Sequence, residues 1–103
     1  VVIPGGFSPD FMRRNEHTIN FVKEMDRLGK PIAAICHGPW MLASCCDLKR
    51  KKVTSFFGIK DDLIHAGAEY VDAEVVVDGN LITSRTPKDL PAFMKAFIEK
   101  VGK

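Results

Sequence analysis

The sequence predicts an α/β sandwich around a mostly parallel sheet. Segments rich in β-branched residues alternate with segments of helical periodicity, as in βαβ units. Residues 31–35 are almost wholly apolar, which is typical of a central parallel strand. Residues 75–77 and 81–84 are β-rich runs on either side of Asp78-Gly79-Asn80, and this pattern predicts a hairpin.

The first third of the chain predicts a strand end, a glycine loop and two helices. Residues 1–3 fit the end of a buried strand, and Gly5 and Gly6 fit a tight loop. Ser8-Pro9-Asp10 has the order of a helix start, with serine as the N-cap. A helix is expected over residues 16–28 and ends at Gly29. Its expected buried stripe is Ile19, Val22, Met25 and Leu28.

The rest of the chain continues the alternation. After the strand at 31–35 we expect a helix over 38–46, a short strand over 53–56, a helix over 59–66 and an extended segment over 70–72. The hairpin follows, and a last helix runs from residue 87 or 88 to 101. One side of that helix should carry its apolar residues Leu90, Phe93, Met94, Phe97 and Val101.

Composition limits the classes of protein. The chain has 103 residues, enough for one small domain, and a net charge of +2 with mixed signs, which gives no reason to expect a nucleic-acid partner. No apolar run is long enough to cross a membrane. Three cysteines, without C-x-x-C or zinc-ligand spacing, argue against a disulfide framework and fit a cytoplasmic protein. We expect no metal and no cofactor.

The first residues bear on domain organisation. A buried parallel strand needs neighbours on both sides, and residues 1–3 begin abruptly. We therefore expect residues 1–103 to form the larger, C-terminal part of a single domain without its N-terminal βαβ portion. The alternative is a complete small domain that starts with an edge strand.

Cys36 is the main candidate for chemistry. It follows the apolar strand, and His-Gly-Pro interrupts the chain before a helix-like stretch resumes. Backbone N–H groups at such a turn favour an anion and hence a thiolate, the form that attacks carbonyls. His37 is a candidate proton carrier. The alternatives are a buried structural cysteine and a capping or exposed histidine.

The loop at Gly5 and Gly6 is expected to lie beside Cys36. Both segments follow strands, and reactive groups gather at the carboxyl ends of strands in open α/β sheets. The backbone N–H groups of the glycine loop and of His37 would then form an oxyanion hole, as in a nucleophile elbow. Asp10 is a weaker candidate, because an acid in the first turn of a helix also has a structural reason to be there.

Other reactive side chains have structural interpretations. Cys45 and Cys46 are expected in or near the core, and Trp40 is expected to pack rather than to line a pocket. Arg85 could bind a carboxylate or pair with a nearby aspartate, and we favour the pair.

These residues resemble the ThiJ/PfpI family of the class I glutamine amidotransferase-like superfamily. The resemblance is closest to its PfpI branch of intracellular cysteine proteases and general stress proteins. It covers essentially the whole chain in the family's order, at residues 2–6 (Val-Ile-Pro-Gly-Gly), 8–10 (Ser-Pro-Asp), 29–31, 34–39 (Ala-Ile-Cys-His-Gly-Pro), 60–63, 72–80 and 83–90.

The resemblance implies a flavodoxin-like fold, a nucleophilic Cys36 and His37 as its base. It also implies a homodimer or hexamer with the site near a subunit interface, where an acid from the neighbouring subunit completes a triad. Asp10 has that position here, whereas the archetypal protease has glutamate. The family's early strand and helix, with an acid that hydrogen-bonds the cysteine, have no counterpart in this sequence.

Three functions follow as hypotheses. The first is an enzyme that attacks carbonyls through Cys36, either hydrolysing peptides through a thioester or acting on small 2-oxoaldehydes and glycated adducts through a hemithioacetal, as a glyoxalase or deglycase. The second is a non-catalytic stress protein in which Cys36 senses oxidants, with chaperone-like holdase behaviour. The third is an oligomerisation module whose elbow is a relic.

Overall fold

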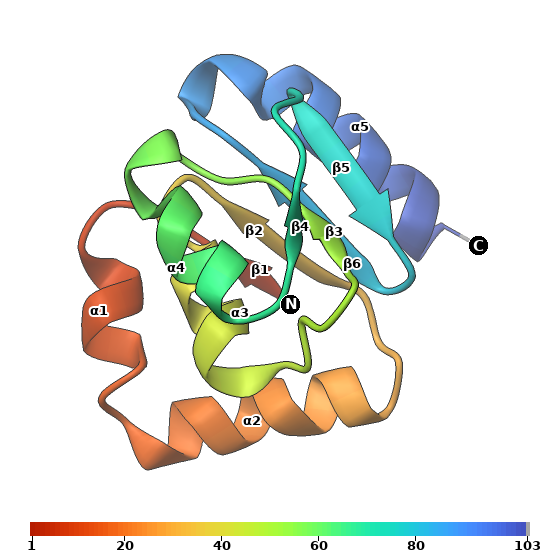
Figure 1. Cartoon of the computed structure of the whole chain (residues 1–103). Coiled ribbons are helices and arrows are strands. Elements are labelled where there is room, and N and C mark those ends of the chain that lie inside the picture. The colour runs from red at the N-terminus through yellow and green to blue at the C-terminus, as the bar shows by residue number, and fades with distance from the viewer. Residues whose placement is uncertain (103) are drawn as a thin grey trace.

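A four-stranded sheet forms the centre of the computed structural model, which describes residues 1–102 (Figure 1). Its strands lie in the order β1 (Val2–Ile3), β2 (Ile32–Ile35), β6 (Leu81–Ser84) and β5 (Val75–Asp78). The first three are mutually parallel, and β5 runs antiparallel to β6 across the predicted hairpin. The predicted α/β class, the mostly parallel sheet and the central place of residues 31–35 are confirmed.

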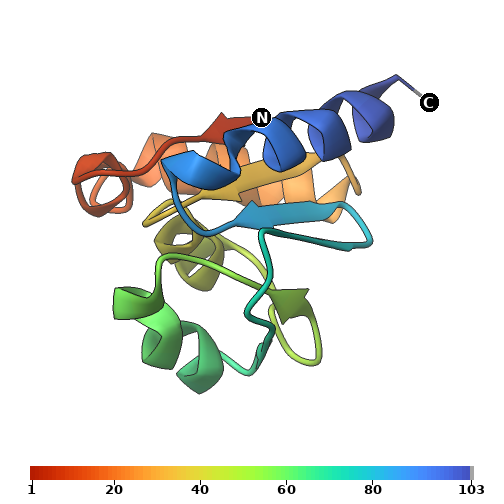
Figure 2. The same ribbon diagram turned by 90° about the horizontal axis from the view of Figure 1, so that it is seen from above.

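Helices lie on both faces of this sheet. They are α1 (Ser8–Met12), α2 (Glu16–Arg27), α3 (Pro39–Cys45), α4 (Lys60–His65) and α5 (Leu90–Val101), with 3-10 turns at Phe57–Ile59 and Pro87–Asp89. Figure 2 shows α5 on one side of the sheet and α3 and α4 on the other. Among residues 1–102, no helix has the length and apolar character needed to span a bilayer.

The two faces of the sheet are covered unequally. The larger core joins the sheet to α2, α3 and α4 through buried side chains that include Ile3, Val22, Met41, Leu42 and Leu63. Among the described residues, the core under α5 has four buried members: Ala33, Ile35, Ile82 and Phe93. Burial of apolar side chains is the main favourable term in folding, so the first core is expected to contribute more to stability.

The predicted apolar side of the last helix is only partly covered. Phe93 is buried, and Phe97 packs against the same core. Leu90, Met94 and Val101 are 43%, 40% and 54% exposed. The helical period of the sequence groups these residues on one side of α5, but the sheet covers only part of that side.

Two details of the earlier helices also differ from the prediction. Phe7 holds the N-cap position of α1 and makes no side-chain capping bond, so Ser8 lies inside the helix. Leu28, placed in the buried stripe of α2, caps the helix and is 53% exposed, whereas Val22 is buried as predicted. Gly29 follows with φ +70°, the left-handed conformation expected of a residue that ends a helix.

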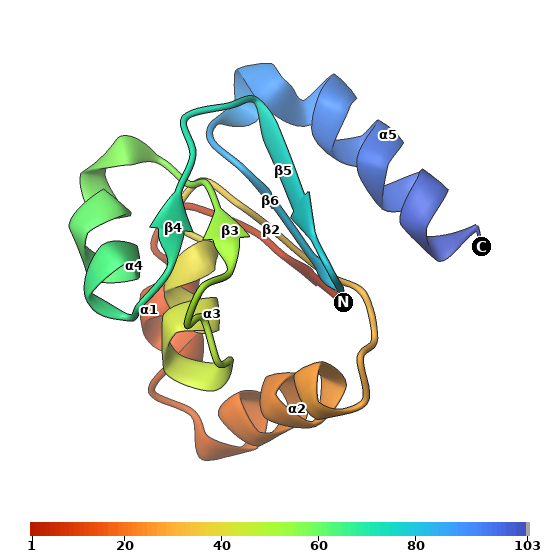
Figure 3. The same ribbon diagram turned by 45° about the vertical axis from the view of Figure 1, so that its right-hand side comes forward.

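The strand predicted over 53–56 is shorter and does not join the main sheet. β3 (Lys52–Val53) pairs with β4 (Glu69–Tyr70) in a separate parallel ribbon, which Figure 3 shows to the left of β2 and β6. Side chains of the hairpin bind its backbone instead: Asp78 Oδ2 accepts from the Lys52 N–H at 2.8 Å, and Thr83 Oγ1 accepts from the Thr54 N–H at 2.9 Å. These contacts hold β3 against the hairpin without a ladder of backbone hydrogen bonds.

Candidate active site

Cys36 lies at the carboxyl end of β2 in a left-handed backbone conformation. Its φ is +63°, which costs a residue with a side chain about 1–2 kcal/mol. Its N–H donates to Ser84 O at 3.1 Å, and its carbonyl accepts from the Phe56 N–H at 2.9 Å. Such strain persists only where the surroundings impose it and is common at reactive residues. The predicted strand-to-helix elbow is therefore present.

Two glycines make the tight approach to Cys36 possible. A Cβ added at Gly5 would lie 2.7 Å from Cys36 Cβ and 3.3 Å from its Sγ. A Cβ at Gly38 would lie 2.7 Å from Ile3 O and 2.9 Å from Ile35 O. The shortest distance at each glycine, 2.7 Å, is shorter than the contacts of real Cβ atoms, so no larger residue fits without movement. The glycine loop after β1 thus lies beside the cysteine, as predicted.

His37 places a ring nitrogen next to the thiol. Its Nδ1 lies 3.4 Å from Cys36 Sγ, within hydrogen-bond range for sulfur. The imidazole packs between Trp40 and Phe56, with 5.0 Å between ring centroids in both cases. Trp40 is itself held by a 2.7 Å bond from its Nε1 to Asp62 Oδ2. These contacts fix the ring, and the Trp40 side chain packs as predicted.

Backbone N–H groups at the elbow are free to face a substrate oxygen. Within residues 1–102, those of Gly5, Gly6 and His37 make no backbone hydrogen bond, whereas the Gly38 N–H is used by Ile35 O at 2.8 Å. Gly6 has φ +67°, which turns the loop at this point. The geometry leaves the predicted oxyanion donors available, and their role stays a prediction.

A small cavity opens at the thiol. It has a volume of about 210 Å³ and is lined by Gly5, Gly6, Ile35, Cys36, Pro87 and Leu90. Pockets for drug-sized ligands typically range from about 300 to 1,000 Å³, so this one suits a small carbonyl compound or one group of a larger substrate.

Asp10 lies on α1 and pairs within its own helix. Its carboxylate binds the Arg14 guanidinium four residues later. No hydrogen bond joins Asp10 to His37 within the part of the chain that the structure describes. The exposed Phe7 and Phe11 flank this aspartate, at 82% and 62% exposure. A triad role for Asp10 therefore depends on a second copy of the chain and stays a prediction.

The other two cysteines differ from Cys36. All three thiols are free, so no disulfide is present. Burial raises the pKa of Cys45, and burial together with Asp26 raises the pKa of Cys46 to about 12. Both pack in or against the main core, as predicted, and neither is poised to form a thiolate near neutral pH.

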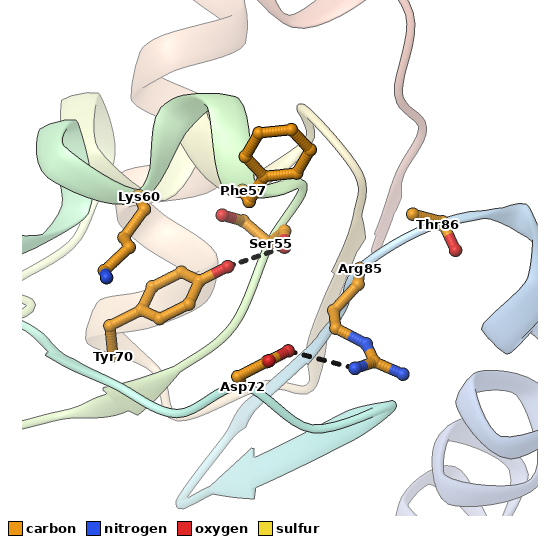
Figure 4. A pocket seen from close by; sticks show the side chains of 7 residues that line it. All are labelled: Ser55, Phe57, Lys60, Tyr70, Asp72, Arg85 and Thr86. Carbon is orange, nitrogen blue, oxygen red and sulfur yellow. Dashed lines mark hydrogen bonds and ion pairs between the residues drawn. The ribbon is translucent and has the colours of Figure 1, made fainter.

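A second, larger cavity lies at the same edge of the fold and was missed by the sequence reasoning. Its volume is about 540 Å³, and Figure 4 shows its lining residues: Ser55, Phe57, Lys60, Tyr70, Asp72, Arg85 and Thr86. Most of them follow the ends of β3, β4 and β6. The signal in the sequence was the polar and aromatic residues placed just after predicted strands, where parallel strands present their carboxyl ends.

Arg85 pairs with aspartates, as the sequence reasoning favoured. Its Nε donates to Asp89 Oδ2 at 2.9 Å, its Nη2 to Asp89 Oδ1 at 3.2 Å and its Nη1 to Asp72 Oδ1 at 2.9 Å. The bonds to Arg85 hold the pKa of Asp89 below its usual value, and those to both aspartates raise the pKa of Arg85. Among the described residues, no cluster of histidine, cysteine, aspartate and glutamate is arranged to hold a metal ion.

Comparison with known proteins identifies the family. A model of the DJ-1/PfpI family matches residues 1–100. The chain belongs to the DJ-1/PfpI family. The family resemblance expected from the elbow and glycine-loop motifs is confirmed, and 78 chains of solved structures match this chain.

Three similar proteins illustrate the family. A deglycase of Pyrococcus horikoshii is 52% identical over 96% of this chain and 60% of its own length. The candidate cysteine protease YraA of Bacillus subtilis is 52% identical over 90% of this chain and 55% of its own length. A two-domain protein of Anabaena variabilis, with DJ-1/ThiJ/PfpI-like and ferritin-like domains, superposes with a TM-score of 0.94 at 52% identity, over 99% of this chain and 29% of that one. The chain thus spans between about half and three fifths of the curated relatives' length.

Proposed function

We propose that this protein is a cysteine-dependent enzyme that attacks carbonyl groups, with deglycase or glyoxalase chemistry on small 2-oxoaldehydes and their adducts. The observation that carries the proposal is the contact of Cys36 Sγ with His37 Nδ1 at 3.4 Å, on a strained elbow that lines a small cavity. A nucleophile within reach of an adjacent base is the signature of covalent catalysis. The names of several similar proteins include deglycase, which supports this reaction class.

The first chemical step follows from these positions. The thiol proton moves to His37 Nδ1 while Sγ forms a bond to the carbonyl carbon, and the carbonyl π electrons move to oxygen. The N–H groups of Gly6 and His37 stabilise that oxyanion, a contribution that typically amounts to about 10²–10³ in rate per donor. Return of the proton from His37 to the oxygen gives a hemithioacetal.

Peptide hydrolysis is the second candidate reaction. The same attack on an amide would expel an amine, which takes the proton from His37 and leaves a thioester that water cleaves. The similarity to the candidate cysteine protease YraA supports this alternative, while the small cavity at Cys36 favours a small substrate.

The test compares Cys36→Ser, His37→Gln and the matched control Cys46→Ser on methylglyoxal and on a casein substrate. We expect the first two variants to lose at least about 100-fold in turnover, as is usual for loss of a general base or a nucleophile, and the control to keep wild-type turnover. Full turnover by Cys36→Ser on both substrates would exclude this mechanism. Casein cleavage with no methylglyoxal consumption would favour the peptidase.

We further propose that a second copy of the chain supplies Asp10 and that the active form is a homodimer or hexamer. Support comes from the outward position of Asp10 between exposed Phe7 and Phe11, because aromatic residues are enriched at protein interfaces. We also propose a cytoplasmic location and a stress-related role.

Complementation tests this arrangement. Cys36→Ala and Asp10→Asn should each be inactive alone. After unfolding and refolding of an equal mixture, about a quarter of the sites combine an intact cysteine with an intact aspartate from the neighbour, so about a quarter of wild-type activity should return. A monomer by light scattering, or no recovery in the mixture, would contradict the shared site.

A further inference from the structure

The larger cavity is a direct neighbour of the elbow. Cys36 donates its N–H to Ser84 and accepts a hydrogen bond from Phe56, and the residues that follow these two partners, Arg85 and Phe57, line the cavity. Thr86 lines this cavity and Pro87 lines the small one at the thiol. A substrate with its carbonyl at Cys36 can therefore extend past this short segment into the larger space.

Arg85 is held as a fixed cationic wall of that cavity. Its bidentate contact is with Asp89, whose side chain is only 8% exposed, so a buried carboxylate anchors the guanidinium, which is itself partly exposed. Its third contact is with Asp72, whose side chain is 82% exposed. A guanidinium has five N–H donors. Three are used here, which leaves two without a partner among the described residues.

Lys60 gives the facing wall a second positive charge. Lys60 is one of the lining residues, and Figure 4 shows its side chain beside Tyr70, on the far side of that ring from Arg85. Its Nζ lies 5.8 Å from the centre of the Tyr70 ring, and it forms no ion pair with any residue in the described range 1–102. The Tyr70 hydroxyl donates to Ser55 O at 2.8 Å, which fixes the ring between the two cations.

The charged side chains that line the cavity favour an anionic ligand. Asp89 is committed to Arg85 in the interior, whereas the exposed Asp72 makes a single contact that solvent screens. When Asp72 turns outward, the cavity presents Lys60 and the free edge of Arg85 to whatever enters. Two cations on opposite walls repel a positively charged group, and a planar carboxylate matches the donor geometry of a guanidinium.

We propose that this cavity is a subsite for a carboxylate of the substrate, remote from the carbonyl that reacts at Cys36. The incoming carboxylate replaces Asp72 on Arg85 Nη1 and faces Lys60, while Tyr70 and Phe57 contact the carbon chain that carries it. Asp72 thus acts as a competing internal anion, and Arg85 and Lys60 determine specificity. The assignment to a substrate rests on the proposed function, whereas the binding itself does not.

The experiment measures binding without turnover. N-acetylglycine is the carboxylate probe, and N-acetylglycinamide is the neutral probe of the same shape. A two-dimensional ¹H–¹⁵N NMR titration follows the Arg85 Nε–H and the amides of Tyr70 and Thr86. We expect saturable shifts at these signals with the acid, no such shifts with the amide, and the same binding in Cys36→Ala as in the wild type.

Three variants separate this role from a structural one. Asp72→Asn removes the competitor and should tighten N-acetylglycine binding by up to about fivefold, while Lys60→Met should weaken it by about two- to fivefold, because exposed ion pairs have energies of this size. Lys95→Met removes an exposed lysine of α5 and should leave the affinity unchanged. A merely structural Arg85–Asp72 pair would give no gain in Asp72→Asn.

The outcomes are distinguishable from those for catalysis. Equal binding of acid and amide, shifts that do not saturate, or unchanged or weaker binding in Asp72→Asn would overturn the subsite. Selective N-acetylglycine binding in a protein that consumes no carbonyl substrate would retain the subsite and reject the proposed function. Turnover that depends on Cys36, without N-acetylglycine binding, would reject the subsite and retain the proposed function.

Discussion

Replacing Gly5 with alanine should damage the elbow by direct contact with Cys36, the proposed nucleophile. The new Cβ would lie 2.7 Å from Cys36 Cβ, whereas ordinary contact begins at 3.4 Å, so the loop and the cysteine must separate by about 0.7 Å (3.4 minus 2.7). Overpacking of this kind costs about 1–3 kcal/mol of stability. A misplacement near 1 Å at a reacting group can reduce the rate about 100-fold, so turnover should fall by one to two orders of magnitude.

Gly29→Ala is the matched control, because it changes a glycine at the other end of β2 from Cys36 without a clash. Nothing lies within 4 Å of a Cβ at Gly29, but its φ of +70° disfavours alanine by about 1 kcal/mol. Gly29→Ala should therefore lower stability while retaining most of the turnover. The two changes together separate a steric effect on Cys36 from simple loss of stability.

The assay is urea unfolding followed by fluorescence of Trp40, the single tryptophan, together with methylglyoxal consumption at 25 °C, where both variants are folded. Iodoacetamide labelling of Cys36 provides a readout that does not depend on the substrate. The reasoning is refuted if Gly5→Ala has wild-type stability and labelling rate, or if Gly29→Ala loses as much reactivity as Gly5→Ala.

Three further predictions concern other parts of the fold. Burial raises the pKa of the Cys45 thiol, and it raises the pKa of Cys46 to about 12. Iodoacetamide at pH 8 should therefore add one label to the native chain and three in urea, as measured by intact mass; two or more labels on the folded protein would contradict this. Arg50 is exposed with φ +64°, so Arg50→Gly should raise stability by about 0.5–1 kcal/mol in urea unfolding, and a loss would show that the loop depends on its side chain. Arg85 holds the pKa of Asp89 below its ordinary value of 3.8, so this pair stabilises the fold fully above pH 3.8 and less as the pH falls through the lowered value; Asp89→Asn should be less stable than the wild type at pH 7, and the difference should shrink in acid. A difference that stays constant down to pH 2 would assign the stability to another group.

The sequence by itself determined the order of elements and the position of Cys36, the proposed nucleophile. Residues 31–35 are apolar on both faces, and such a run is stable only as an interior strand, so β2 and the turn at Cys36 followed from local pattern. The hairpin followed in the same way from its turn residues, and the tight loop at residues 5 and 6 from its two glycines. These features depend on residues near one another in the chain.

Only the tertiary structure decided which surfaces are covered and which side chains meet. The helical period of α5 marked five apolar positions, but the sheet beneath covers one flank, so Leu90, Met94 and Val101 are exposed. β3 does not pair with the main sheet. Instead, the side chains of Asp78 and Thr83 bind the backbone at Lys52 and Thr54, and these contacts join residues more than 25 positions apart.

The same reason explains the site. Local pattern predicted Cys36, His37 and the glycine loop, because each lies at the end of a recognisable strand. The aromatic packing of Phe56 on His37, and the cavity that brings Lys60 opposite Arg85, come from loops that are distant in sequence. The periodicity of apolar residues and the residues that form turns can be recognised within about a dozen residues of sequence. Contacts between loops depend instead on how the layers of helices and strands pack.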